Sequence, residues 1–203
     1  MNYYNDYLSK FSVAMENVAA TITKNTATDT DTTISTIVSA IRECKTNNKK
    51  IIIIGNGGSA AIASHVAIDF WKNGGVRATA FNDSSLLTCI SNDFCYEEVF
   101  VKPIERFADA GDIVFAISSS GKSANITNAV TAAKEAGCTT VTMSGFGEDN
   151  PLRSMGDYNF YIKDGGYGVV EIGHLFLMHT IADKYIAQYV TKTLTESAEA
   201  SFV

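Results

Sequence analysis

A run of four isoleucines followed by a glycine-rich turn constrains the fold more than any other segment of this chain. Residues 51–54 are all β-branched and apolar, the motif GNGGS follows at 55–59, and an apolar stretch continues from there. Such a run is typical of a fully buried strand, and the serine after the glycines is typical of a helix start. The turn aims backbone N–H groups and the positive end of a helix at one small volume, which favours an anion such as a phosphate.

Two side chains that can carry chemistry lie on the helix predicted after this turn. His65 and Asp69 are spaced i,i+4 and therefore share one helix face. An imidazole and a carboxylate on one face suit proton transfer or metal binding. The sequence thus predicts a phosphate-binding turn and a pair of side chains suited to proton transfer or metal binding within one short segment.

The glycine turn also fits the loose dinucleotide fingerprint G-x-G-x-x-G/A, through Gly55, Gly57 and Ala60. That fingerprint requires an acidic residue about 20 positions further on, at the end of the next strand. The next predicted strand ends in Asn82-Asp83, which is late for this role. A dinucleotide site and a tight turn without a ligand are therefore the alternatives to a sugar-phosphate site.

A second loop, SSSGKS at residues 118–123, follows a predicted strand and precedes a predicted helix. Its end resembles the P-loop G-x-x-x-x-G-K-[ST], but the first glycine would fall at Ala116, so the match fails. Serine hydroxyls around a helix N-terminus supply donors that suit a monophosphate. The alternative is a plain capped loop, because serine is common at N-caps. The serine loop is the better phosphate candidate, which leaves residues 55–59 as a wall of a sugar site.

A long apolar segment further along carries Glu171, His174 and His179. At about 100° per residue, Glu171 and His179 lie about 80° apart on a helix and can reach into one cavity. His174 lies on the other side of Glu171, and we expect it to be a hydrogen-bonded core residue.

Composition argues against several classes of function. The chain has 203 residues and a net charge of −6, with a sequence pI near 5.0. This charge disfavours a nucleic-acid partner, which usually needs a basic face. We expect no signal peptide and no membrane-spanning segment, hence a cytoplasmic protein without a membrane partner. The cysteines lack metal-ligand spacing and are expected to be reduced and mostly buried: Cys44, Cys89, Cys95 and Cys138.

The order of apolar patterns predicts an α/β fold of one domain. Helical spacing covers residues 3–25, and a Thr/Asp-rich break at 26–31 offers N-caps for a second helix through about Cys44. Strands and helices then alternate, which predicts a parallel sheet with right-handed crossovers. The expected strands are 51–54, 76–81, 112–117, 139–143 and 158–162, and the expected helices are 59–72, 98–108, 123–136 and 169–192. We assign residues 1–48 to N-terminal helices that serve oligomerisation within the same domain, 49–192 to the main body, and 193–203 to a frayed tail.

Five motifs occur in one order along the chain: GNGGS at 55–59, His65-x-x-x-Asp69, SNDF at 91–94, the serine loop at 118–123, and Glu171…His179. Together they resemble the sugar isomerase (SIS) domain and, within it, the phosphoheptose isomerases. The resemblance covers nearly the whole chain. It implies a flavodoxin-like five-stranded parallel sheet sandwiched by helices, and a homotetramer with active sites at subunit contacts.

The resemblance also assigns roles by position. The catalytic pair falls on Asp69 and His179. The zinc ion that some members bind would be held by His65, Asp69, Glu171 and His179. The substrate phosphate falls to Ser118, Ser119, Ser120 and Ser123, and the sugar falls to Asn56, Gly57, Ser59, Asp93 and Glu171.

Three positions depart from the family pattern. Asp69 stands where the family has Glu, Glu171 where it usually has Gln, and Asn73, beside Lys72, where it usually has Arg. Two neighbouring carboxylates repel each other unless a cation lies between them or one is protonated. The pair Asp69 and Glu171 therefore strengthens the case for a metal and weakens the inference of an exact substrate.

The implied activity is aldose–ketose isomerisation of D-sedoheptulose 7-phosphate to a D-glycero-D-manno-heptose 7-phosphate through an enediol, for the heptose of surface polysaccharides. Two alternatives stay open. One is a non-catalytic SIS adaptor that binds the bacterial replication initiator, and the other is an isomerase of a different ketose phosphate.

Overall fold

A seven-stranded sheet forms the centre of the computed structural model, which describes residues 2–23 and 26–191. The strands lie in the order β2-β1-β7-β6-β5-β3-β4. Their bounds are β1 (Ala19–Ile22), β2 (Thr26–Thr28), β3 (Lys50–Gly55), β4 (Arg77–Ala80), β5 (Ile113–Ser118), β6 (Thr139–Ser144) and β7 (Tyr158–Tyr161).

The five strands from β3 to β7 are parallel, as the alternating pattern predicts. Their order, β4-β3-β5-β6-β7, is the order of flavodoxin-like doubly wound sheets. β3 lies between β4 and β5, and its four isoleucines have no exposed surface. Ile51 and Ile53 pack into the hydrophobic cluster on one face, and Ile52 and Ile54 pack into the cluster on the other. In such a sheet the loops that follow the parallel strands meet at the carboxyl edge.

The prediction of one helix over residues 3–25 is wrong, and so is the count of five strands. The helix ends at Glu16, and β1 and β2 form a hairpin whose strand β1 pairs antiparallel with β7, with Ala20 opposite Phe160. The sequences AATI at 19–22 and TAT at 26–28 supply β-branched residues that pack well in a sheet. The helical spacing of apolar residues stops before this hairpin, so the helix predicted over residues 3–25 is too long.

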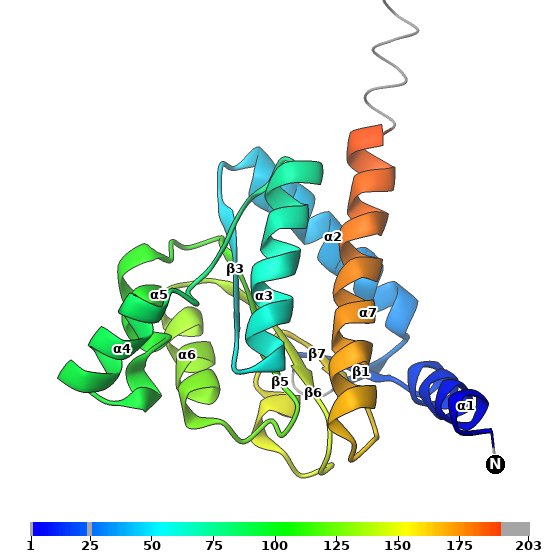
Figure 1. Cartoon of the computed structure of the whole chain (residues 1–203). Helices are drawn as coiled ribbons and strands as arrows, with labels where there is room; N and C mark the ends of the chain where they lie inside the picture. The colour runs from blue at the N-terminus through cyan, green and yellow to red at the C-terminus, as the bar shows by residue number, and fades with distance from the viewer. Residues whose placement is uncertain (1, 24–25, 192–203) are drawn as a thin grey trace, which may run out of the picture.

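Helices cover both faces of the sheet (Figure 1). One hydrophobic cluster joins the sheet to α1, α2, α3 and α7, and a second cluster joins the other face to α5 and α6. Figure 1 shows α3 and α7 side by side in front of the sheet, and residues of the two helices are in contact. The helix bounds are α1 (Tyr3–Glu16), α2 (Thr30–Thr46), α3 (Gly58–Ile68), α4 (Ser84–Asp93), α5 (Val101–Phe107), α6 (Ala124–Glu135) and α7 (Tyr167–Ile186). The shorter turns are the π-helices η2 (Asp69–Asn73) and η5 (Ala187–Thr191) and the 3-10 helices η3 (Tyr96–Glu98) and η4 (Pro151–Ser154).

Most predicted helix positions are confirmed, with two exceptions. The Asp29 carboxylate accepts a hydrogen bond from the Thr32 backbone N–H and caps α2, as the Thr/Asp-rich break predicts. The predicted helix at 98–108 begins only at Val101, after η3. α4 was not predicted; none of its residues is buried, and only Leu87 and Ile90 pack against the second hydrophobic cluster. The predicted frayed tail at 193–203 lies outside the described residues.

The expectation that the cysteines are mostly buried holds for two of the four. Cys44 and Cys138 are buried, and burial raises the pKa of each thiol to about 11. Cys89 and Cys95 are exposed, because Cys89 lies on α4 and Cys95 is the N-cap of η3, two elements in which no residue is buried. All four thiols are free.

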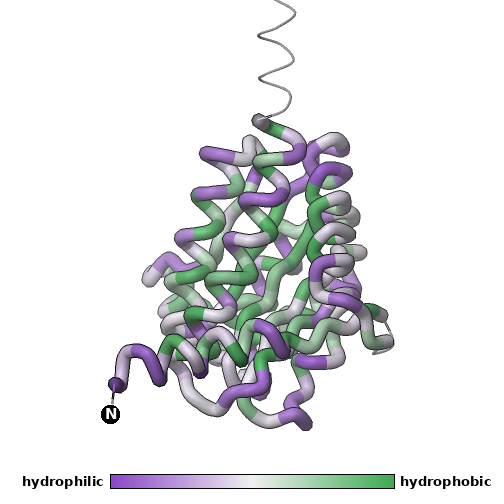
Figure 2. The backbone as a smooth tube through the Cα atoms, turned by 90° about the vertical axis from the view of Figure 1, so that its right-hand side faces the viewer, coloured by the Kyte–Doolittle hydropathy of each residue, from purple (hydrophilic) through white to green (hydrophobic). Residues whose placement is uncertain are grey.

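Hydropathy follows the layers of the fold. In Figure 2 the hydrophobic positions concentrate in the middle of the molecule, and many hydrophilic positions lie on the outer turns of helices. Among the described residues, no helix has both the length and the apolar character that crossing a bilayer requires.

Candidate active site

The serine loop lies where β5 ends and α6 begins. Ser118 and Ser119 are buried, Ser123 is the N-cap of α6, and the hydroxyl oxygens of Ser118 and Ser123 lie 3.4 Å apart. The Ser119 hydroxyl is buried and has no hydrogen-bond partner among the described residues. The loop therefore presents hydroxyl groups beside the positive end of a helix, which is an arrangement that binds anions.

Gly121 allows this loop its tight turn. Its φ is +61°, and its N–H donates to the Ser118 carbonyl oxygen at 3.0 Å. A side chain at position 121 would collide with the buried Asn150 side chain. The loop is held from behind by two backbone hydrogen bonds, from Gly145 N–H to the Ser119 carbonyl and from Leu152 N–H to the Gly121 carbonyl. The serine loop is therefore fixed before any ligand binds.

A cavity of about 130 Å³ opens beside the serine loop. It brings together the loop after β3, the start of α3, the serine loop and the start of α7. Its lining residues are Asn56, Ser59, Ile117, Ser118, Ser119, Ser120, Ser123, Tyr167 and Glu171.

The start of α3 is occupied by a carboxylate of this same chain. Gly57, at φ +54°, is the N-cap of α3, and Gly58 is its first residue. A Cβ atom at Gly58 would lie 2.6 Å from Glu171 Oε2, so the Glu171 carboxylate rests directly on this glycine. A negative charge is favourable at the positive end of a helix. The glycine turn therefore receives Glu171, while the serine loop remains free for a second anion.

Three potential metal ligands converge further along α3 and α7. Asp69 Oδ2 lies 3.6 Å from His65 Nε2 and 3.7 Å from His179 Nδ1, and one ligand atom from each residue lies within 4.8 Å of the other two. The imidazole rings are 5.3 Å apart between centroids. These separations are too long for hydrogen bonds. They are close to the roughly 3.4 Å between two ligands of a tetrahedral zinc ion with bonds of about 2.0–2.1 Å.

Asp69 has a special position on its helix. α3 ends at Ile68, and Asp69 starts the π-helix η2, so the predicted continuous helix over 59–72 changes its winding at this residue. Such widened turns are frequent at functional sites. The Asn73 side-chain amide donates to Asp69 Oδ1 at 3.2 Å, whereas Asp69 Oδ2 is buried without a hydrogen-bond partner among the described residues. The oxygen that faces both imidazoles is thus free to bind a cation or a proton.

Two of the predicted site residues lie apart from these groups. Glu171 does not belong to the three-residue group, because its carboxylate rests on Gly58 and lines the serine cavity. Asp93 is exposed at the end of α4, where it accepts a hydrogen bond from the Asn92 side chain at 2.9 Å. Asp93 does not line the serine cavity.

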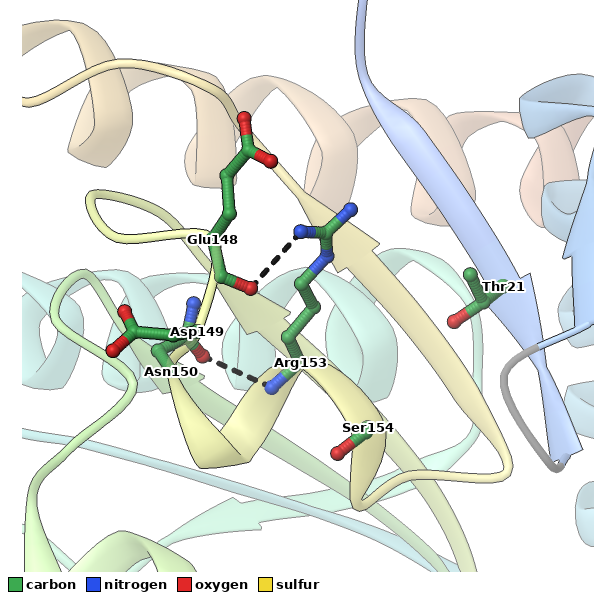
Figure 3. A pocket seen from close by; sticks show the side chains of 6 residues that line it. All are labelled: Thr21, Glu148, Asp149, Asn150, Arg153 and Ser154. Atoms are coloured by element: carbon green, nitrogen blue, oxygen red, sulfur yellow. Dashed lines mark hydrogen bonds between the residues drawn. The ribbon is translucent and has the colours of Figure 1, made fainter.

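A larger cavity, of about 400 Å³, lies between β1 and the segment that follows β6 (Figure 3). Its lining residues are Thr21, Glu148, Asp149, Asn150, Arg153 and Ser154. Arg153 donates to the Glu148 carbonyl oxygen at 3.0 Å and stacks on the Tyr161 ring, so its guanidinium is already engaged. This cavity contains no imidazole, and its wall at Asn150 supports the serine loop instead.

Comparison with known proteins gives the chain its family. Residues 15–145 match the SIS domain. The phosphoheptose isomerase of Crocosphaera subtropica is 36% identical over 168 residues, which cover 80% of this chain and 85% of that protein. The chain belongs to the SIS domain family, in its phosphoheptose isomerase branch.

Solved structures of this branch share the fold. The phosphoheptose isomerase of Neisseria gonorrhoeae aligns with this SIS domain at a TM-score of 0.77 and 26% identity, over 90% of this chain and 97% of that one. The phosphoheptose isomerase of Francisella tularensis aligns at a TM-score of 0.78 and 22% identity, over 92% and 96% of the two chains. The second likeness concerns the fold alone.

The structure adds three polar residues to the site of this SIS domain that sequence reasoning missed. Tyr167 lines the serine cavity at the first turn of α7. Asn125 and Tyr96 hydrogen-bond to Asn56, which lines the same cavity. The tyrosines lie outside the quoted motifs. Asn125 is the second residue after the serine loop but contacts a residue 69 positions away. No local pattern in the sequence indicates these contacts.

His174 is confirmed as a core residue of this SIS domain. It has no exposed surface, and its Nε2 lies 3.2 Å from the Ser144 carbonyl oxygen. Since a carbonyl oxygen only accepts, Nε2 carries the proton in this contact. Burial lowers the pKa of His174 to about 4, so the ring is neutral at physiological pH.

We expect His174 to make the protein less stable in acid. Between pH 6.5 and 4 an unfolded His174 binds a proton that the folded one does not bind, so the free energy of unfolding decreases as the pH falls through this window. His174→Gln retains a donor near the Nε2 position and removes the titration. Urea unfolding from pH 7.5 to 4.5 measures this, because all other titrating groups are common to both proteins. The slope should be shallower in the variant by up to one proton, and equal slopes would contradict the assignment.

Proposed function

We propose that this chain is an aldose–ketose isomerase that interconverts D-sedoheptulose 7-phosphate and a D-glycero-D-manno-heptose 7-phosphate in heptose biosynthesis. One observation carries the proposal: the serine-lined cavity and the group His65, Asp69 and His179 both lie along α7 and along α3 with its continuation η2. Glu171, at the cavity, and His179 are eight residues apart on α7, which is about 12 Å along the axis. The extended chain of a seven-carbon sugar phosphate can bridge this distance.

The serine loop is proposed to bind the phosphate of the substrate. Ser118, Ser119, Ser120 and Ser123 line one cavity at the N-terminus of α6. Hydroxyl groups that can donate, together with a positive helix end, suit a doubly charged phosphate. Binding at this end fixes the far end of the sugar and positions C1 and C2, which converts binding energy into orientation.

Asp69 and His179 are proposed to perform the acid–base chemistry. Isomerisation moves a proton between C1 and C2, which requires a base at carbon and an acid at the two oxygens. Asp69 Oδ2 is desolvated and unpartnered, as a base that must accept a proton from carbon should be. His179 lies 3.7 Å away and is partly exposed, so it can exchange a proton with a sugar oxygen. The hydroxyl groups of the sugar are proposed to bind to four other residues that line the serine cavity: Asn56, Ser59, Tyr167 and Glu171.

The donor set of this group fits zinc. Two imidazoles and a carboxylate are ligands that zinc prefers, and the buried Asp69 Oδ2 lacks the hydrogen bond that a permanently metal-free carboxylate would need. His65, Asp69 and His179 would hold the ion, and Glu171 would not, because its carboxylate rests on Gly58. A bound zinc ion would supply Lewis acidity at the carbonyl and hydroxyl oxygens.

The chain is also proposed to assemble as a homotetramer, with residues 1–48 contributing to the contacts. Large apolar side chains remain exposed on the layer that carries the metal-ligand group, namely Ile68 and Trp71 on α3 and η2 and Ile172 and Phe176 on α7. Large exposed apolar side chains are typical of an interface when they form one patch. The His65 side chain is 59% exposed in the single chain, so a neighbouring subunit at this layer would help to enclose the site.

We expect Asp69→Asn and His179→Ala to lose most of the isomerase activity. Asp69→Asn keeps the size of the side chain and its Asn73 contact but removes the base. Acid–base groups typically contribute about 10²–10⁴-fold each, so kcat/KM for sedoheptulose 7-phosphate should fall at least about 100-fold. The aldose product is measured with and without a zinc chelator, and Asp6→Asn on α1 is the control.

The outcomes separate the candidate functions. Turnover close to that of the unmodified chain in both variants would contradict the catalytic assignment. No turnover by the unmodified chain, together with direct binding of the replication initiator, would favour the adaptor. Turnover of a different ketose phosphate alone would retain the chemistry and replace the substrate.

We expect light scattering to give a mass four times the 21.8 kDa of one chain. Trp71→Glu places a charge on the exposed apolar layer and should reduce the mass. Phe107→Glu is the matched control, because Phe107 is equally exposed but lies on α5, on the other face of the sheet. A monomer in the unmodified chain, or an unchanged mass in Trp71→Glu together with a reduced mass in Phe107→Glu, would refute this arrangement.

A further inference from the structure

Asn56 is held by two polar side chains that take no part in the proposed chemistry. Asn56 Oδ1 accepts a hydrogen bond from Asn125 Nδ2 at 2.9 Å, and Asn56 Nδ2 donates to Asn125 Oδ1 at 3.0 Å. The Tyr96 hydroxyl donates to the same Asn56 Oδ1 at 3.1 Å. Three hydrogen bonds therefore fix one short side chain in the wall of the serine cavity.

The two partners of Asn56 come from separate elements behind and beside the cavity. Asn125 is the second residue of α6, is only 3% exposed and does not line the cavity. Tyr96 opens η3, which packs against α6, and its ring is half exposed. Both residues therefore act on the cavity through Asn56.

A count of donors and acceptors gives Asn56 a defined role. The oxygen of a carboxamide has two lone pairs, and both are used here, by Tyr96 and Asn125. The nitrogen has two hydrogens, of which Asn125 Oδ1 accepts one. One Nδ2 hydrogen remains for a ligand in the cavity.

We propose that Asn125 and Tyr96 are positioning residues that hold the Asn56 carboxamide as a hydrogen-bond donor to a substrate oxygen. Without these contacts the Asn56 carboxamide could rotate and turn its oxygen toward the cavity. That oxygen would repel a phosphate oxygen or a carbonyl oxygen of the substrate. The contact of Tyr96 also connects the α4–η3 segment, which carries Asp93, to the wall of the cavity. The identity of the substrate in this inference rests on the proposed function.

A double-mutant cycle tests whether Tyr96 acts through Asn56. Tyr96→Phe removes one hydroxyl from a half-exposed ring, so the variant should fold. It should weaken the binding of sedoheptulose 7-phosphate and raise its KM about 3- to 10-fold, as expected for one hydrogen bond, with kcat nearly unchanged. In an Asn56→Ala background the same substitution should change affinity less than about 1.5-fold, because its target is gone. Asn125→Leu should behave as Tyr96→Phe does, with a larger effect.

Binding is measured directly, so this test does not require the chain to turn over the sugar, and two control variants accompany it. Tyr4→Phe on α1 and Asn128→Leu on the exposed side of α6 remove comparable groups away from the cavity. Affinity is measured by calorimetry with both sedoheptulose 7-phosphate and inorganic phosphate. Coupling between positions 96 and 56 with either probe supports the inference, even if the chain does not isomerise the sugar. Equal effects of Tyr96→Phe in both backgrounds, or no effect in either with both probes, would overturn it.

Discussion

The burial of β3 on both of its faces is the constraint on which the rest of the structure depends. Its four isoleucines divide between two hydrophobic clusters, and each contributes on the order of 2 kcal/mol by leaving water. A strand buried in this way must lie inside the sheet, between β4 and β5, with helices on both sides. The chain must then turn sharply at residues 55–57 to start α3, and this turn places Asn56 and Ser59 at the carboxyl edge of the sheet.

From that edge the contact between α3 and α7 divides the site into two parts. At the start of α3 the Glu171 carboxylate rests on Gly58, where a Cβ atom would displace it. The negative charge of Glu171 therefore lies at the positive end of α3. The serine loop at the start of α6 is then the better position for the phosphate of a substrate. Two to three turns further along, the same pair of helices brings His65, Asp69 and His179 together. A substrate that is held at one part can be transformed at the other.

The sequence predicts the parallel strands because short runs rich in β-branched or aromatic residues alternate with helical patterns. It predicts the serine loop because four serines around one helix start are unusual. The group of His65, Asp69 and His179 follows from the resemblance to the family, and the structure brings these three residues together. β1, β2 and α4 were missed for a physical reason: strands of four and three residues are too short to show a clear alternation, and no residue of α4 is buried. The pairing of Asn125 with Asn56 and the position of Glu171 against Gly58 depend on contacts between distant parts of the chain, which no local pattern encodes.

We propose that one part of the site holds a phosphate while the other performs proton transfer. The most direct measurement compares kcat/KM for sedoheptulose 7-phosphate with that for sedoheptulose, which has the same reacting carbons and no phosphate. We expect turnover of the phosphorylated sugar and a kcat/KM for the free sugar that is lower by a factor on the order of 100 or more, because remote binding energy positions the reacting end. Equal values for the two sugars, or no turnover of sedoheptulose 7-phosphate, would contradict it.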